Sequence, residues 1–142
     1  MHIEINDKTT LRKIQDTFSN FYPYLRIEFY SRPHKKYEQS NEINQIEPNI
    51  LIGDIKNAHV SGTLEILPLE KVSDLETELR RRFGLFVQVL KKEKNGWEQT
   101  TGMDDFTLAE LNEFGRSSDD DFIIAASEED FEEVEEKPEK LF

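Results

Sequence analysis

The residues that could do chemistry are few and lie far apart along the chain. The three histidines, His2, His34 and His59, have no serine or carboxylate motif beside them, so their spacing predicts no nucleophile and base pair. The 142 residues contain no cysteine, which excludes disulfides, thiol catalysis and cysteine-bound metal within them. No glycine-rich phosphate loop is present either. We therefore predict no catalytic residue and no cofactor, and expect binding rather than catalysis.

Two acidic runs have the residue types of metal ligands. Asp104-Asp105 stands just before a predicted helix and is better explained by turn and helix-start chemistry. The run from Asp119 to Asp121 lacks the glycine and the distal glutamate of a calcium-binding loop. The sequence therefore predicts no metal site.

A local basic cluster is the one candidate for binding an anion. It comprises Arg32, His34, Lys35 and Lys36 in the run Arg32-Pro-His-Lys-Lys36. Such a loop can hold a phosphate, an acidic partner or the acidic end of the same chain. A short charged loop is more often simply solvated, and this alternative stays open. We carry the four residues forward as a candidate anion-binding loop.

The net charge of −12 is distributed unevenly. Residues 117–142 hold eleven acids and two lysines, a net charge of −9, so residues 1–116 carry only −3. We predict that residues 1–116 form a single α+β domain and that residues 117–142 are an acidic, largely flexible tail. A nearly balanced body with an acidic tail gives no attraction for nucleic acid. No stretch approaches the ~20 apolar residues of a membrane helix and no signal peptide is visible, so we expect a cytoplasmic protein that binds no membrane.

The central stretch, residues 70–101, contains the clearest structural signals. Its apolar residues Val72, Leu75, Leu79 and Phe83 have helical spacing, and Gly84 stands where a left-handed C-terminal residue is needed. Asn95-Gly96 is a strong hairpin signal. With those two residues as the loop, Lys94 lies opposite Trp97 and Leu90 opposite Thr101. The alternation of side chains then places Phe86, Leu90 and Trp97 on one face.

The remaining elements are predicted from apolar periodicity. Residues 1–5, 25–30 and 62–68 alternate as strands, and a helical stripe of Leu11, Ile14, Phe18 and Phe21 ends before Pro23. Residues 32–61 form a long inserted connection in which 41–47 and 50–56 could each make a helical turn. Thr107 and Glu110 have capping-box spacing at the start of a two-turn helix that Gly115 closes. Residues 122–126 could add an edge strand or dock on the body.

This order of elements favours an α+β fold. The sequence β-α-β-β-α-β matches the ferredoxin-like split β-α-β sheet with strand order 4-1-3-2, extended by a hairpin strand and a short helix. The competing architecture is a β-grasp-like mixed sheet, which requires residues 50–55 to be a strand. An RNA-recognition fold has the same order, but Glu65 stands where an aromatic side chain would stack on a base.

Phe86, Leu90 and Trp97 make an apolar corner on the sheet face that the helices leave open. One alternative is that Leu108, Leu111 and Phe114 of the last helix cover this corner. The other is that the corner is exposed as a candidate interaction patch for a protein partner or a second copy of the chain. The sequence does not decide between them.

One part of the chain resembles a known pattern. The runs GWEQTT (96–101) and DDFTL (104–108), followed by Asn112, resemble a C-terminal pattern of small uncharacterised bacterial proteins, and cover less than a fifth of the chain. This resemblance implies a bacterial protein but no site. The sequence thus predicts a non-enzymatic interaction or regulatory domain that uses the open sheet face and the acidic tail. The alternative is a small-ligand module or an enzyme with a pocket beneath residues 32–61, where His34, Tyr37 or His59 would meet a carboxylate.

Overall fold

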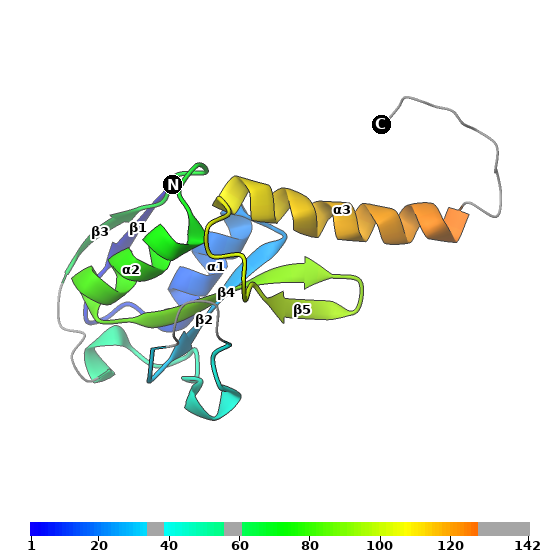
Figure 1. Cartoon of the computed structure of the whole chain (residues 1–142). Helices are drawn as coiled ribbons and strands as arrows, with labels where there is room; N and C mark the ends of the chain where they lie inside the picture. Colours follow the sequence, from blue (N-terminus) through cyan, green and yellow to red (C-terminus); the bar gives the residue numbers. More distant parts are fainter. Residues whose placement is uncertain (34–38, 56–60, 128–142) are drawn as a thin grey trace.

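The computed structural model shows an α+β arrangement of helices and antiparallel strands (Figure 1). It describes residues 1–33, 39–55 and 61–127, with side chains in the last helix described as far as Ser118. Within these residues the order of elements is β1 (His2–Ile5), α1 (Leu11–Phe21), β2 (Leu25–Tyr30), η1 (Glu42–Asn44), η2 (Ile52–Asp54), β3 (Gly62–Glu65), α2 (Val72–Phe83), β4 (Phe86–Glu93), β5 (Gly96–Gln99) and α3 (Leu108–Ser127).

Several local signals in the sequence form the predicted structures. The Thr10 side chain caps α1 by accepting from the Lys13 N–H. Gly84 ends α2 in the left-handed region at φ 68°, and the Leu85 N–H returns to the Leu79 carbonyl at 3.1 Å. Thr107 and Glu110 exchange side-chain to backbone hydrogen bonds of 2.9 and 3.1 Å, so the predicted capping box is confirmed.

The strands form two antiparallel sheets, β1-β3 and β2-β4-β5. Pairing of β1 with β3 and placement of β5 beyond β4 agree with the predicted plan. The ferredoxin-like order is not confirmed, because β2 pairs with β4, which are not neighbours in the order 4-1-3-2. The outer edge of β2, where β3 was expected, is instead occupied by the bridge between Tyr30 and Gln45. Residues 52–54 are a 3₁₀ turn, so the β-grasp alternative lacks its strand.

The hairpin between β4 and β5 differs from its predicted register by two residues. Glu93 pairs with Gly96, so the loop is Lys94-Asn95 and Trp97 lies opposite Lys92. Gly96 takes a φ of 137° just after the loop, which is the conformational freedom that the Asn-Gly signal reports. Because side chains alternate with a period of two, this shift keeps every side chain on its predicted face.

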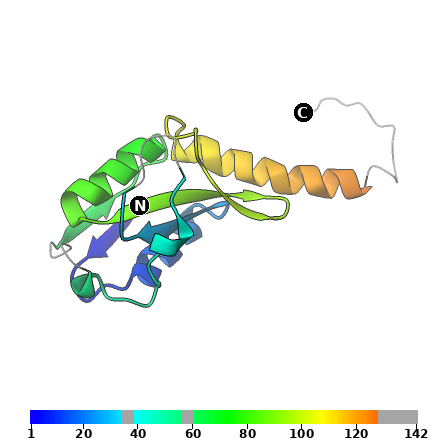
Figure 2. The same ribbon diagram turned by 60° about the horizontal axis from the view of Figure 1, so that its bottom comes forward.

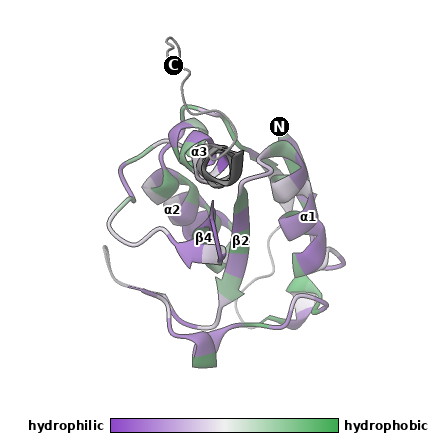
Figure 3. Cartoon of the chain, turned by 90° about the vertical axis from the view of Figure 1, so that its right-hand side faces the viewer, coloured by the Kyte–Doolittle hydropathy of each residue, from purple (hydrophilic) through white to green (hydrophobic). Residues whose placement is uncertain are grey.

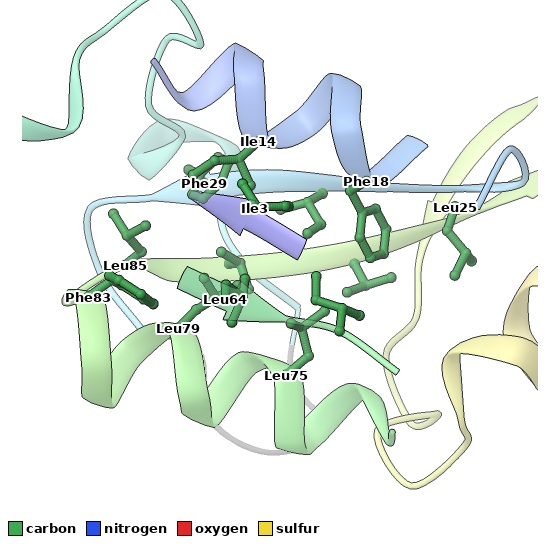
Figure 4. Packing of buried hydrophobic residues seen from close by; sticks show 14 of the residues in the cluster. Ile3, Ile14, Phe18, Leu25, Phe29, Leu64, Leu75, Leu79, Phe83 and Leu85 are labelled. Atoms are coloured by element: carbon green, nitrogen blue, oxygen red, sulfur yellow. The ribbon is translucent and has the colours of Figure 1, made fainter. Parts of the chain in front are cut away.

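One hydrophobic core joins both sheets and all three helices. In Figure 4, side chains of α1 and α2 point toward each other, with strand residues such as Ile3, Leu64 and Phe29 between them. Figure 3 shows α1 and α2 on either side of β2 and β4. The predicted helical stripe of α1 is corrected at its end, because Phe21 is exposed and Tyr22 is buried in its place.

The last helix is longer than predicted and extends away from the body (Figures 1 and 2). Gly115 does not end it but lies inside it, with its Cα against Tyr24 and the backbone of Lys92. Residues 122–126 belong to this helix, so they do not form the edge strand that the sequence allowed. The helix crosses the boundary predicted at residue 116, and the division into domain and tail stays a prediction.

Candidate binding site

The sheet face predicted to be open is mostly covered. Glu28, Tyr30, Gln88 and Leu90 all belong to this face, and each is at least nine-tenths buried. Ser40, which lies in the long connection just before η1, packs against this face.

Ser40 ties the connection to the sheet through polar contacts. Its N–H donates to Gln99 Oε1 at 2.8 Å, and Gln99 Nε2 donates to the Ser40 carbonyl at 3.1 Å. The Ser40 hydroxyl donates to Gln88 Oε1 at 3.1 Å. Gln88 has no exposed surface, so its amide needs such partners to be buried at low free-energy cost.

The predicted interaction patch of Phe86, Leu90 and Trp97 does not form one surface. Phe86 pairs with Tyr30 at the start of β4, whereas Trp97 lies opposite Lys92, six residues along, which is about 20 Å in a strand. Leu90 lies between them and is buried. Whether any of the three binds a partner stays a prediction.

Trp97 has cations near its ring instead of apolar neighbours across the hairpin. The Arg26 guanidinium lies 5.2 Å from the ring centroid and the Lys92 ammonium 5.6 Å. Both distances are in the range of cation–π attraction. Half-buried and held in this way, Trp97 is better suited to fixing the hairpin than to presenting a free apolar surface.

The last helix does not cover the predicted corner. Leu108 and Leu111 join the main core with Val87 and Val89, on the opposite face of β4 from Leu90. Phe114 remains 41% exposed and packs edge-on against Phe106, with ring centroids 5.6 Å apart. Of the two alternatives, covering by this helix is therefore not what the structure shows, because the helix packs across the core side of the sheet.

The candidate polar residues lie in different places. Arg32 is exposed, and the other three members of the candidate anion-binding loop, His34, Lys35 and Lys36, lie outside the described residues, as do Tyr37 and His59. His2 forms an exposed contact of 3.3 Å with Glu65, its neighbour across β1 and β3. The Asp104-Asp105 pair lies in a turn, where the Asp104 carbonyl accepts from the Ser73 N–H at 2.9 Å.

An apolar hollow of about 320 Å³ lies where the connection meets the sheet. We call it the β2–β4 hollow. Its walls are mostly hydrophobic, and its volume is at the lower end of the range for ligand pockets. The lining residues are Phe29, Tyr30, Ser31, Ile46, Ile55, Gly84, Leu85 and Phe86.

Backbone contacts hold the walls of the β2–β4 hollow in place. The Ile46 N–H donates to the Phe29 carbonyl at 2.8 Å, and the Ser31 N–H donates to the Asn44 carbonyl at the same distance. Ile55 follows η2, which is fixed by the fully buried Ile52. The connection thus supplies two isoleucines, while the ends of β2 and β4 supply the aromatic surface.

The described lining of the β2–β4 hollow has one acidic hydroxyl, that of Tyr30. Burial, and next the nearby Glu28 carboxylate, raise the pKa of Tyr30 far above neutrality. The Tyr30 hydroxyl is directed to Glu28 Oε1 at 3.3 Å, and Arg26 holds the other carboxylate oxygen at 2.5 Å. None of the lining side chains that the structure describes ionises near pH 7. The described lining therefore offers mainly apolar contact.

Sequence reasoning found only part of this site. It left a pocket beneath the connection as an alternative, and it did not single out Ile46, Tyr30 or Leu85. Leu85 was visible only as a strand residue and Phe86 as a member of the predicted interaction patch, because the hollow is formed by segments that are distant in the sequence.

Comparisons with protein-family models, curated proteins and solved structures found no match to the chain. In the described parts of the chain, no group of three histidine or carboxylate side chains is placed to hold a metal ion. Of the helices in the described residues, none has the length and apolar character that crossing a bilayer requires.

Proposed function

We propose that the chain is a non-enzymatic protein-interaction domain whose β2–β4 hollow receives an apolar anchor side chain of a partner protein. The observation that carries this proposal is the hydrophobic lining by Phe29, Ile46, Ile55, Leu85 and Phe86. Interfaces draw much of their binding free energy from a few large side chains inserted in such pockets. A volume of about 320 Å³ suits one such side chain.

The acidic residues 117–142 are a second proposed contact, for a basic surface of the same partner. The charge of −9 in this segment would favour such a partner, and added salt would weaken that contribution. Anchor burial in the hollow would depend much less on salt, so the two contacts can be measured separately.

The first test uses soluble models of an anchor side chain. We expect the methyl NMR signals of Ile46 and Ile55 to shift on titration with N-acetyl-leucinamide or N-acetyl-tryptophanamide. Ile46→Asp should abolish the response by placing a charge in the hollow. The matched control is Ile43→Asp, because Ile43 belongs to the same connection but is 84% exposed and does not line the hollow.

The second test uses the partner itself. Proteins that co-purify with the full chain from its own cells should be retained by Ile43→Asp and lost by Ile46→Asp. If Ile46→Asp keeps the same partner while remaining folded by circular dichroism, the hollow is not the interface. If neither N-acetyl-leucinamide nor N-acetyl-tryptophanamide shifts the methyl signals of Ile46 and Ile55, the hollow accepts no anchor and the proposal fails.

Binding of a small apolar molecule in the same hollow is the second candidate. It is favoured by the mostly apolar lining, to which the connection contributes Ile46 and Ile55. Native mass spectrometry of the chain purified from its own cells separates the two candidates. A bound small mass that Ile46→Asp removes would support a ligand in place of a protein partner.

A further inference from the structure

A second, polar hollow lies between α1 and the outer edge of β2. Its volume is about 290 Å³, and the residues that matter for its chemistry are Arg12, Gln15, Asp16, Ile27 and Glu28. We call it the α1–β2 groove. The Ile27 side chain belongs to the core, so it is the Ile27 backbone that faces this groove.

The pairing of β2 fixes which backbone groups face the groove. The Lys92 N–H donates to the Tyr24 carbonyl, while the Val89 carbonyl accepts from Thr100 on the other side of β4. Backbone groups alternate in direction along an antiparallel strand. Residues 26, 28 and 30 therefore pair with β4, and the N–H and carbonyl groups of Leu25, Ile27 and Phe29 point outward.

The outward carbonyls of β2 all have donors. The Ser19 hydroxyl donates to the Leu25 carbonyl at 3.1 Å, Gln15 Nε2 to the Ile27 carbonyl at 2.9 Å and the Ile46 N–H to the Phe29 carbonyl at 2.8 Å. Side chains of α1 thus act as caps on this edge, which opposes pairing with another strand.

The outward N–H groups of β2 have fewer hydrogen-bond partners than its outward carbonyls. The Leu25 N–H donates to the Tyr22 carbonyl at 3.0 Å. Within the described parts of the chain, the Ile27 and Phe29 N–H groups have no acceptor. A backbone N–H in such a buried position favours any group that can accept its hydrogen bond. The groove therefore presents the Ile27 N–H as a hydrogen-bond donor, whereas the carbonyls along the same edge already accept hydrogen bonds.

Arg12 supplies a cation to the lining of the same groove. Its Nε donates to Asn49 Oδ1 at 2.8 Å, which leaves its terminal nitrogens available. Arg26 is held by Glu28, so its charge is already balanced. A guanidinium and a nearby N–H together match the two oxygens of a carboxylate. Asp16 also lines the groove and would repel a phosphate dianion more than a carboxylate monoanion.

We propose that the α1–β2 groove binds a carboxylate group of a ligand, with the Ile27 N–H donating to one oxygen and the Arg12 guanidinium to the other. This site is separate from the β2–β4 hollow, because the two spaces share no lining residue. It would serve small carboxylates or a carboxylate on a larger molecule.

The test is a titration of the full chain with sodium acetate, followed by the Ile27 amide signal in ¹⁵N NMR spectra. We expect a saturable shift in the wild type, and a loss of affinity of about tenfold in Arg12→Gln, since charge-assisted hydrogen bonds are strong. Lys13→Gln removes the neighbouring exposed cation of α1 and should change the affinity less than about twofold. Asn49→Ala leaves the guanidinium in place and should retain binding.

Parallel titrations use sodium chloride and inorganic phosphate at matched ionic strength. The proposal is supported if acetate shifts the Ile27 amide signal more than either chloride or phosphate does. Equal shifts with chloride would overturn it, because the effect would then be general screening. Stronger binding of phosphate than of acetate would also overturn it, as would equal acetate affinities of Arg12→Gln and Lys13→Gln. The absence of any saturable shift would overturn it as well, because only solvent would then occupy the groove.

Discussion

Gly115 offers the sharpest test of how α3 is held against the body. It lies inside this helix at the point where the helix crosses β2 and β4. A Cβ atom at this position would lie 2.8 Å from the Cβ of Tyr24, 2.9 Å from the Tyr24 carbonyl oxygen and 3.4 Å from the Lys92 nitrogen. The closest neighbours are backbone or next to backbone, so they cannot move aside as the end of a flexible side chain can.

Two opposing effects determine the stability of Gly115→Ala. Replacing glycine by alanine inside a helix stabilises it by about 1 kcal/mol. Inserting a methyl group into a closely packed contact destabilises by roughly 1–3 kcal/mol. The contacts below 3 Å place this site toward the upper part of that range, so we expect a net loss of about 1–2 kcal/mol in the free energy of unfolding.

Urea unfolding of the full chain, followed by circular dichroism, measures this difference. Glu113→Ala on the exposed side of the same helix is the control and should stay within about 0.5 kcal/mol of the wild type. A stabilised Gly115→Ala variant would refute the reasoning, because helix propensity alone would then act and the helix would not contact Tyr24.

Two further predictions concern caps and buried hydroxyls. Thr107→Ala should lower the free energy of unfolding by about 1 kcal/mol, while Glu110→Gln keeps the capping box and should change it little. Tyr22→Phe should leave stability at pH 7 unchanged or raise it by up to about 1 kcal/mol, because the buried Tyr22 hydroxyl has no partner among the described residues. Burial and then Glu70 raise the pKa of Tyr22 to about 12. The folded state therefore holds this proton more tightly than the unfolded state, whose pKa is about 10. The resulting stability is present below pH 10 and is lost as the pH rises toward 12, so alkaline unfolding should be less steep in Tyr22→Phe.

In the hairpin, a local signal located the turn but did not fix which residues pair across the two strands. Asn95-Gly96 correctly indicated a tight turn between β4 and β5, because glycine permits a positive φ there. The loop itself is Lys94-Asn95, one residue earlier. Which residues face each other depends on the other pairs along both strands, and Leu90 pairs on one side with Arg26 of β2 and on the other with Gln99.

The candidate site was predictable only as a location. The length of the connection left a pocket beneath it as an alternative, and the β2–β4 hollow is lined by Ile46 and Ile55 of that connection. The roles of Ser40 and Gln99 were not predictable, since single polar residues in a polar run have no periodic pattern. Their contact joins positions 59 residues apart.

The sequence by itself determined the elements whose causes are local. The α2 stripe, the Thr107 cap and the left-handed Gly84 depend on neighbours within one or two turns, and the structure forms all three. Tertiary structure alone decided that β2 pairs with β4, that the connection covers the outer sheet face and that α3 packs on the core side. These outcomes depend on competition between segments for the same edge or face, and such competition is settled by total burial and hydrogen bonding across the whole chain.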